Sequence, residues 1–276
     1  MDTIEKALQK FDQAPGVPGA DRNSPPPDGA TALSSRSRAE INFDQLRAEG
    51  LLVPDDTRTQ LKEEFRHIKR PLLKKLAANS ANGRTQHRNI VMVTSARPGE
   101  GKTYNAINLA LSVAEERNRR VLLIDADVLK PSVGRKLGLE ETRGLVDYLT
   151  GEAQGLRDLL LKTNIPQFTV MQSGKRHHLT TELLASDRMR QLIDELAQRY
   201  SDRVVVFDCP PLLSTTEASV LVQLAGQVVM VVAEGETTHS EVNKSLALIG
   251  SKTDVGVVLN KSRVGHDGYG YYYYGS

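Results

Sequence analysis

The C-terminal two thirds of the chain alternates short apolar runs with segments of helical periodicity. The apolar runs are rich in Val and Ile without polar alternation, which is typical of parallel strands buried on both faces. Apolar residues at helical spacing lie between the runs, most clearly at 102–117, 181–200 and 238–250. This alternation predicts a doubly wound, mostly parallel α/β sheet. The predicted strands are 89–95, 120–126, 168–174, 203–209, 227–233 and 255–260.

The N-terminal third follows a different pattern. Residues 2–13 have the apolar spacing of a short amphipathic helix, which either frays or docks elsewhere. Residues 14–38 are rich in Pro, Gly and small polar residues, which predicts a disordered linker. Residues 40–53 have a weak, mixed pattern. Residues 56–79 are amphipathic, and Pro71 is expected to kink the segment or divide it into two helices.

Composition narrows the class of protein. The 276 residues are 39% hydrophobic and 25% charged with a net charge of +2, so no overall field points to nucleic acid or an anionic membrane. No apolar stretch approaches the roughly 18 residues that span a bilayer, and the acidic N-terminus is unlike a secretory signal. The single cysteine, Cys209, excludes an internal disulfide. These features predict a cytoplasmic protein.

A phosphate-binding loop is the strongest local signal. Residues 96–103 read ARPGEGKT between a predicted strand and a predicted helix, and differ from the usual pattern by Ala96 at the first position. Gly99 and Gly101 permit the turn that aims amides at phosphate oxygens. Lys102 supplies a charge for the β- and γ-phosphates, and the Thr103 hydroxyl can bind Mg²⁺. The alternative is an incidental glycine-rich turn.

Acidic residues end two of the predicted strands. Asp125 and Asp127 follow the strand at 120–126, and Asp208 ends the strand at 203–209. Ligands of open parallel sheets bind beyond the carboxyl ends of the strands, where the phosphate loop also lies. We expect Asp208 to bind the metal, Asp125 to act as general base and Asp127 to assist on the metal side. The alternative for Asp208 is a helix cap or turn.

Two other reactive residue types carry weaker signals. Cys209 has no obvious base beside it, so a small buried residue is the better interpretation. His177 and His178 are adjacent, and neighbouring residues do not readily face one metal, so a solvated loop is expected.

The C-terminus is a separate low-complexity segment. Five of the eight tyrosines of the chain lie within its last eight positions, flanked by Gly. No basic run interleaves them, which argues against a stacking tail for nucleic acid. A flexible substrate with several phosphorylation sites explains them better. The candidate phosphorylation sites are Tyr269, Tyr271, Tyr272, Tyr273 and Tyr274.

These motifs together resemble the bacterial tyrosine kinases of exopolysaccharide synthesis. The resemblance rests on SARPGEGKT at 95–103, VLLIDADVLKP at 121–131, VVVFDCPP at 204–211 and the tyrosine-rich end. Without membrane spans of its own, the chain is most similar to the stand-alone kinase form, and in particular to autokinases of exosortase-associated exopolysaccharide loci. Apart from the tail, each motif would also suit partitioning-type P-loop ATPases.

The resemblance implies a fold, two cofactors and a set of site residues. It implies a P-loop NTPase fold of the partitioning or MinD-like kind with N-terminal helices, using ATP and Mg²⁺. The catalytic set is Lys102, Asp125, Asp127 and Asp208, and the metal set is Thr103, Asp127 and Asp208. The implied nucleotide contacts are Arg97, Pro98, Gly99, Glu100, Gly101, Lys102, Thr103, Tyr104 and Asn260.

The resemblance also implies partners. Subunits would form a ring through an E-x-x-R-x-x-R motif, for which Glu63 and Arg66 match but Lys69 replaces the last arginine. A separate inner-membrane polysaccharide co-polymerase would activate the kinase and hold it peripherally at that membrane, and a tyrosine phosphatase would reverse the modification. No nucleic acid is expected.

Four parts of the chain follow from these patterns. They are a short helix with a disordered linker at 1–39, a helical oligomerisation segment at 40–85, a P-loop kinase domain at 86–264 and a flexible tail at 265–276. Two other functions stay open: a switch ATPase that controls assembly without kinase activity, and a tyrosine-rich scaffold. The switch class uses a signature lysine early in the loop, where this chain has Ala96 and Arg97.

Overall fold

The computed structural model describes residues 38–55, 57–77, 87–153, 155–175, 177–178, 180–251 and 253–262. The predicted helix at 2–13, nearly all of the linker and the tail tyrosines lie outside these residues. The described residues belong to one compact unit of the chain. Within the described part of the chain, no helix is both long and apolar enough to cross a bilayer.

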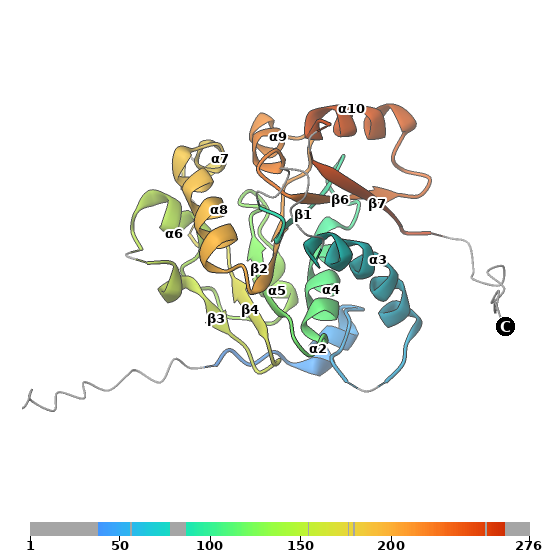
Figure 1. Ribbon diagram of the computed structural model, residues 1–276, viewed down its shortest axis with the longest axis vertical. Helices are drawn as coiled ribbons and strands as arrows, with labels where there is room; N and C mark the ends of the chain where they lie inside the picture. The colour runs from blue at the N-terminus through green and yellow to red at the C-terminus, as the bar shows by residue number, and fades with distance from the viewer. Residues whose placement is uncertain are drawn as a thin grey trace, which may run out of the picture. The chain divides into compact units, whose positions relative to one another are not determined.

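A seven-stranded sheet forms the centre of this compact unit (Figure 1). The strands are β1 (Ile90–Ser95), β2 (Arg120–Asp125), β3 (Leu161–Lys162), β4 (Phe168–Met171), β5 (Arg203–Asp208), β6 (Gln227–Ala233) and β7 (Asp254–Asn260). Their order is β3-β4-β2-β5-β1-β6-β7. All neighbours pair in parallel except β3 and β4. The predicted doubly wound, mostly parallel sheet is therefore confirmed, while the two-residue strand β3 was missed.

Helices cover both faces of the sheet. They are α2 (Phe43–Ala48), α3 (Gln60–Ala77), α4 (Lys102–Ala114), α5 (Val133–Lys136), α6 (Leu145–Thr150), α7 (Thr180–Leu184), α8 (Asp187–Arg199), α9 (Thr216–Val222) and α10 (His239–Ile249), with a 3-10 turn η1 (Leu156–Leu159). Successive residues of a strand point to opposite faces. In β1, Val91 and Val93 accordingly join the core beneath α2–α5, whereas Ile90 and Met92 join the core beneath α6–α10.

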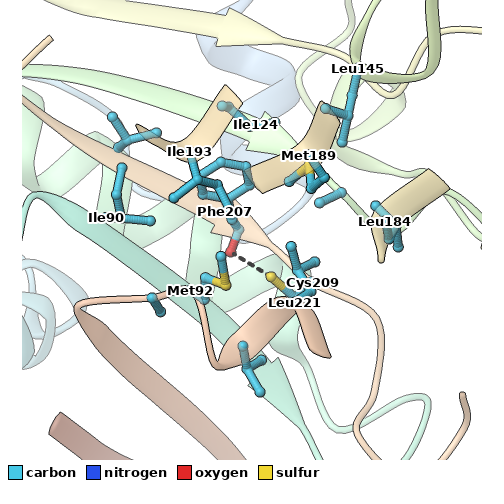
Figure 2. Close-up of a cluster of buried hydrophobic side chains, with 14 of the residues drawn as sticks. Ile90, Met92, Ile124, Leu145, Leu184, Met189, Ile193, Phe207, Cys209 and Leu221 are labelled. Atoms are coloured by element: carbon cyan, nitrogen blue, oxygen red, sulfur yellow. Dashed lines mark hydrogen bonds between the residues drawn. The ribbon is translucent and has the colours of Figure 1, made fainter. Parts of the chain in front are cut away.

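Figure 2 shows part of the second of these cores. Phe207 of β5 lies between Ile124 of β2 and Ile193 of α8. The Cys209 thiol lies 3.8 Å from the Phe207 carbonyl oxygen in the same cluster. Burial raises the pKa of this thiol well above its ordinary value, so the sequence interpretation of Cys209 as a small buried residue is confirmed.

Two helix predictions are wrong. The helix predicted at 181–200 is interrupted, because Ser186 adopts an extended conformation and its hydroxyl accepts the Met189 N–H to cap α8. Pro71 was expected to kink its helix or divide it in two; α3 runs unbroken from Gln60 to Ala77, so the division is wrong. Pro71 is exposed, so water can hydrate the carbonyl that loses its partner, and Phe65 anchors the opposite face in the core.

The weakly patterned segment 40–53 belongs to the same folded unit. Ile41, Leu46, Leu51 and Leu52 are buried. The Leu52 N–H donates to the Asn108 side chain of α4 at 2.7 Å. These contacts attach the N-terminal segment to the sheet that carries the functional site.

Candidate functional site

The phosphate loop joins β1 to α4 at the carboxyl edge of the sheet. Its glycines have positive φ angles, 88° at Gly99 and 97° at Gly101, in the region that favours glycine. A Cβ atom on Gly101 would lie 2.0 Å from the Asn260 side-chain nitrogen, so a larger residue does not fit there. No side chain caps the helix after Gly101. The first N–H groups of α4 are therefore available to an anion.

Glu100 holds the loop in this shape from within. Its side chain is buried, and one carboxylate oxygen accepts the Arg97 N–H at 2.8 Å. The other oxygen accepts the hydroxyl of Thr237, which lies between β6 and α10. The Asn260 amide at the end of β7 donates to the Glu100 carbonyl at 2.8 Å. Glu100, a predicted nucleotide contact, thus lies behind the loop, and sequence reasoning missed Thr237.

The remaining predicted nucleotide contacts differ in how far they are exposed to solvent. Arg97, Pro98 and Gly99 are exposed at the outer turn of the loop. Arg97 lies 3.6 Å from Glu241 of α10. Tyr104 is half-buried on α4, with its ring edge-on to Phe65 of α3 at a centroid distance of 6.4 Å.

The structure brings together the phosphate-loop residues and the three predicted carboxylates. Asp125 and Asp208 are register partners on β2 and β5. The Lys102 ammonium lies 2.5 Å from Asp127 and 3.7 Å from Asp208. The Thr103 hydroxyl donates to Asp208 at 2.6 Å. The expected convergence of three loops at one edge of the sheet is present.

Electrostatics distinguish the members of this cluster. Burial lowers the pKa of Lys102, but the charges of Asp208 and Asp127 more than offset this, so the pKa lies above its ordinary value. Burial also raises the pKa of Asp208 to about 6, although Lys102 and Thr103 oppose the rise. Lys102 thus remains a cation among three buried carboxyl groups.

The pKa of Asp125 is raised further than that of Asp208. Burial, and after it the charge of Asp208, raises the pKa of Asp125 to about 8. One carboxylate oxygen accepts the N–H groups of Ser132 and Val133 at 2.9 and 3.0 Å. The other oxygen is buried without a hydrogen-bond partner in the described structure. A carboxyl with this pKa is mostly protonated at neutral pH, and its ionised form is a stronger base than an ordinary carboxylate.

The oxygen atoms at the start of α4 fit a magnesium ion. Thr103 and Asp208 are in contact, and one Asp208 oxygen has no hydrogen-bond partner. Mg²⁺ prefers such oxygen ligands and usually completes its shell with phosphate and water. Among the described residues, no three His, Cys, Asp or Glu side chains form a metal site by themselves. A metal here would therefore depend on oxygens from a bound nucleotide.

Sequence reasoning missed one residue that supports the cluster. The Ser132 hydroxyl lies 3.3 Å from the Thr103 hydroxyl, and the Ser132 N–H donates to Asp125. Ser132 belongs to no recognisable motif, so only the folded arrangement reveals it.

The predicted oligomerisation residues do not share one environment. Glu63 and Arg66 lie 2.5 Å apart on α3, and both reach solvent. Lys69 is 4% exposed, donates to the Ser112 carbonyl at 2.6 Å and lies 2.8 Å from Glu116. Lys69 therefore contacts α4 within its own subunit.

The fold and the site together define a nucleotide-binding protein of the P-loop class, and comparison with known proteins narrows the class. The family model described as "AAA domain" matches residues 88–251. Tyrosine-protein kinase YwqD of Bacillus subtilis is 37% identical over 186 residues, covering 66% of this chain and 76% of YwqD. Tyrosine-protein kinase CpsD of Streptococcus pneumoniae is 34% identical, with 66% and 79% covered. The chain therefore belongs to the bacterial tyrosine-protein kinase family.

Other relatives and solved structures agree with this assignment. Tyrosine-protein kinase wzc of Salmonella typhimurium is 34% identical over 67% of this chain, which spans only 26% of wzc. The chimerical protein CapA2B2 has a TM-score of 0.65 at 27% identity, with 80% of this chain and 92% of that chain covered. The kinase domain of Escherichia coli ETK has a TM-score of 0.62 at 26% identity, with 82% and 98% covered.

The predicted P-loop fold of the MinD kind is also supported. MinD of Pyrococcus horikoshii, solved with Mg-ADP, has a TM-score of 0.52 at 22% identity over 62% of this chain and 69% of MinD. At this identity the likeness concerns the fold alone.

Proposed function

We propose that this chain is an ATP-dependent protein tyrosine kinase that phosphorylates the tyrosines at its own C-terminus. One observation carries the proposal: Lys102 and Thr103 meet Asp127 and Asp208 at the start of α4, with Asp125 beside them. Phosphoryl transfer needs positioned cations and a carboxylate near the attacking oxygen. Relatives named tyrosine-protein kinases add weight, since they share this part of the chain.

In the proposed reaction, residues 97–103 bind the triphosphate through backbone N–H groups, and Lys102 neutralises charge on the β- and γ-phosphates. Thr103 and Asp208 would hold Mg²⁺, with Asp127 on the metal side. Bound magnesium supplies additional neutralisation of the transferring phosphoryl group. Asn260 stays a proposed contact of the base, for which its amide has a second N–H besides the one that the Glu100 carbonyl accepts.

The transfer step uses the ionised form of Asp125 as the proton acceptor. A tyrosine oxygen attacks the γ-phosphorus, an O–P bond forms, and the bond between that phosphorus and the bridging oxygen of ADP breaks. The phenol, whose ordinary pKa is near 10, gives its proton to Asp125. Burial and the Asp208 charge raise the pKa of Asp125 to about 8. This smaller difference in pKa makes the proton transfer easier than transfer to an ordinary carboxylate.

The proposal is tested on the full-length protein with Mg-ATP, following ADP and phosphotyrosine together. Wild type should produce both, and Asp125→Asn should slow phosphotyrosine formation by about 10²–10⁴. Lys102→Met should abolish it, whereas Lys74→Met, which alters an exposed lysine of α3, should not. A chain ending at residue 264 should still bind ATP and acquire no phosphotyrosine.

Two results would contradict the proposal. ADP without phosphotyrosine would favour the switch ATPase. Unimpaired phosphotyrosine in Lys102→Met would mean that another kinase modifies the chain, as in the scaffold hypothesis. In the structure Arg97 has 57% of its side chain exposed and lies near Glu241 of its own chain, which gives no specific support to the switch.

We further propose the wider role that the family suggests. The kinase would assemble as a ring, act with an inner-membrane polysaccharide co-polymerase and regulate exopolysaccharide synthesis or export and chain length. A phosphatase would reverse it, and the exosortase-associated type is the proposed subtype. Each phosphate adds about −1.5 to −2 charges, so extensive phosphorylation should eject the tail and loosen the ring. Identical gel-filtration volumes for phosphorylated and dephosphorylated protein would contradict this regulation.

A further inference from the structure

A cavity lies beside the proposed phosphoryl-transfer site. It has a volume of about 950 Å³ and is lined mainly by α5, the segment 138–143 and the segment 172–175. Sites for small ligands usually measure about 300–1,000 Å³. Asp125 and Ser132 line the cavity, but no residue of the phosphate loop does. The cavity is therefore separate from the phosphate loop. Asp125 both lines the cavity and belongs to the catalytic cluster.

Positive charge dominates the cavity wall. Arg135, Arg143 and Lys175 line it, and all three are exposed. No ion pair with a described residue engages Arg143 or Lys175, whereas Arg135 interacts electrostatically with Glu49. Asp125 and Glu141 are the acidic residues among the described residues of the lining. Three cations against these two carboxyl groups leave a surplus of about one positive charge.

Buried hydrogen bonds hold this wall in place. The Asp147 carboxylate accepts the N–H of Gly144 at 2.7 Å and that of Lys175 at 3.4 Å. Gly174 has a φ of +85°, and a Cβ atom there would lie 2.1 Å from that carboxylate. The Gln172 side chain donates to the Glu140 carbonyl at 2.7 Å. The backbone that carries Lys175 is thus fixed, which is a property of a prepared binding site.

We propose that this cavity is a phosphotyrosine subsite, which holds an already phosphorylated tyrosine of a C-terminal tail while a neighbouring tyrosine faces Asp125. This inference rests on the proposed kinase function. Alternate residues of an extended segment are separated by roughly 7 Å, so the closely spaced tyrosines from Tyr269 to Tyr274 suit two adjoining sites. Arginine binds phosphate through paired N–H groups, and lysine adds a point charge.

Charge matching sets the number of phosphates that the subsite favours. One phosphotyrosine carries about −1.5 to −2 charges, which Arg143 and Lys175 can pair directly. The first phosphate should therefore retain the tail and promote a second transfer. A tail with four or five phosphates exceeds that capacity and is repelled by the nearby carboxylates. The subsite accounts for both multiple phosphorylation and final release.

The test measures peptide binding to the dephosphorylated full-length protein without nucleotide, so it does not depend on kinase activity. Fluorescent peptides of residues 265–276 are compared by anisotropy: unmodified, phosphorylated at Tyr272, and carrying Tyr272→Glu. The phosphopeptide should bind at least about tenfold more tightly than the unmodified one. Arg143→Gln with Lys175→Gln should reduce this preference to less than about twofold. Arg157→Gln with Lys162→Gln, which removes two exposed cations outside the cavity, should preserve it.

Three results would overturn the proposal. One is equal binding of the modified and unmodified peptides to wild type. Another is a preference that survives in the cavity double variant while its unfolding midpoint is unchanged. The third is binding of the Glu peptide as tight as that of the phosphopeptide, because the cavity would then accept acidic side chains in general. Inorganic phosphate in excess should displace the phosphopeptide to the level of the unmodified peptide.

A second arm uses the reaction itself. With Mg-ATP, the cavity double variant should add the first phosphate to its tail at the wild-type rate and accumulate singly phosphorylated protein, as counted by intact mass. Loss of the first phosphate would instead place these cations in the transfer step and overturn the subsite. Absence of any phosphate in wild type would refute the kinase function, while the binding comparison would still stand.

Discussion

Asp125 shows how burial at one residue links stability to the proposed chemistry. The side chain is 1% exposed, and its pKa is raised from 3.8 to about 8 by burial and by the charge of Asp208. Between these pH values the folded protein binds a proton that the unfolded chain has released. Stability therefore falls as pH rises through this window. The carboxyl that would accept a proton from the phenol thus weakens the fold as it ionises.

Replacing Asp125 by Asn should flatten this pH dependence. The amide oxygen can still accept the Ser132 and Val133 N–H groups, but no proton is released as pH rises. From pH 5 to pH 8 the wild type should lose about 1–3 kcal/mol more unfolding free energy than Asp125→Asn, since one pKa unit corresponds to about 1.4 kcal/mol. Urea unfolding without nucleotide at both pH values measures the difference. Parallel pH profiles for the two proteins would contradict the prediction.

Glu100 supports a second prediction at this scale. Thr237→Val removes a hydroxyl from a buried carboxylate and should cost about 1–3 kcal/mol of stability. The thermal midpoint should fall by roughly 2–4 °C for each kcal/mol. Because Glu100 loses a hydrogen bond that helps to hold the phosphate loop in place, the KM for ATP should also rise. Thr238→Val, which removes the adjacent hydroxyl that caps α10, is the matched control: it should lower stability but leave the KM unchanged.

At the residue scale, sequence reasoning works where chemistry depends on a motif. The proximity of Lys102, Asp125 and Asp208 was predicted because strand ends and the glycine loop restrict where such residues can meet. Ser132 and Thr237 were not, because each contributes one hydroxyl whose value depends on a partner distant in the chain. Local sequence contains no signal for such a contact.

Helix α3 illustrates the same limit at the scale of an element. Its amphipathic pattern was read correctly, and its continuity through Pro71 was not, because packing on α4 outweighs the local preference. Likewise the interruption between α7 and α8 depends on a cap at Ser186 that the 3.6-residue period does not encode. Periodicity predicts which face is buried more reliably than where a helix ends.

Lys69 and Arg66 allow an experiment on this helix. Lys69→Met keeps the apolar stem and leaves the Ser112 carbonyl without its donor, so the dilute protein should lose about 1–3 kcal/mol of unfolding free energy. The exposed pair of Arg66 with Glu63 contributes little, and Arg66→Met should change stability by less than about 0.5 kcal/mol. Urea midpoints compare the two variants. A larger loss in Arg66→Met than in Lys69→Met would contradict the assignment of Lys69 to its own subunit.

In the whole molecule, the helical segment and the sheet depend on each other. The segment before residue 86 contributes six buried apolar side chains to one core. At about 1.5–3 kcal/mol each, their loss would remove roughly 9–18 kcal/mol, comparable with the total stability of a domain. The predicted division at residue 85 is a boundary of sequence pattern, and these contacts show why pattern alone does not determine which parts fold together. The buried residues are Ile41, Leu46, Leu51, Leu52, Val53 and Phe65.

Truncation tests this dependence. A chain that begins at Ser37 should unfold cooperatively, whereas a chain that begins at residue 86 should expose an apolar face, bind a hydrophobic dye and lack a sharp transition. Circular dichroism melts and dye binding at equal concentrations measure the outcome. A sharp transition at an unchanged midpoint in the shorter chain would show that the segment covers the sheet without stabilising it.

The order of strands has a consequence for the timing of synthesis. Strand β5 lies between β1 and β2 in the sheet, although it follows them by many residues in the chain. While the protein is still being translated, Asp125 and Asp208 cannot meet until the ribosome has passed residue 208. The proposed acceptor tyrosines follow every described strand in the chain. They are therefore synthesised only after the strands that bring the proposed site together.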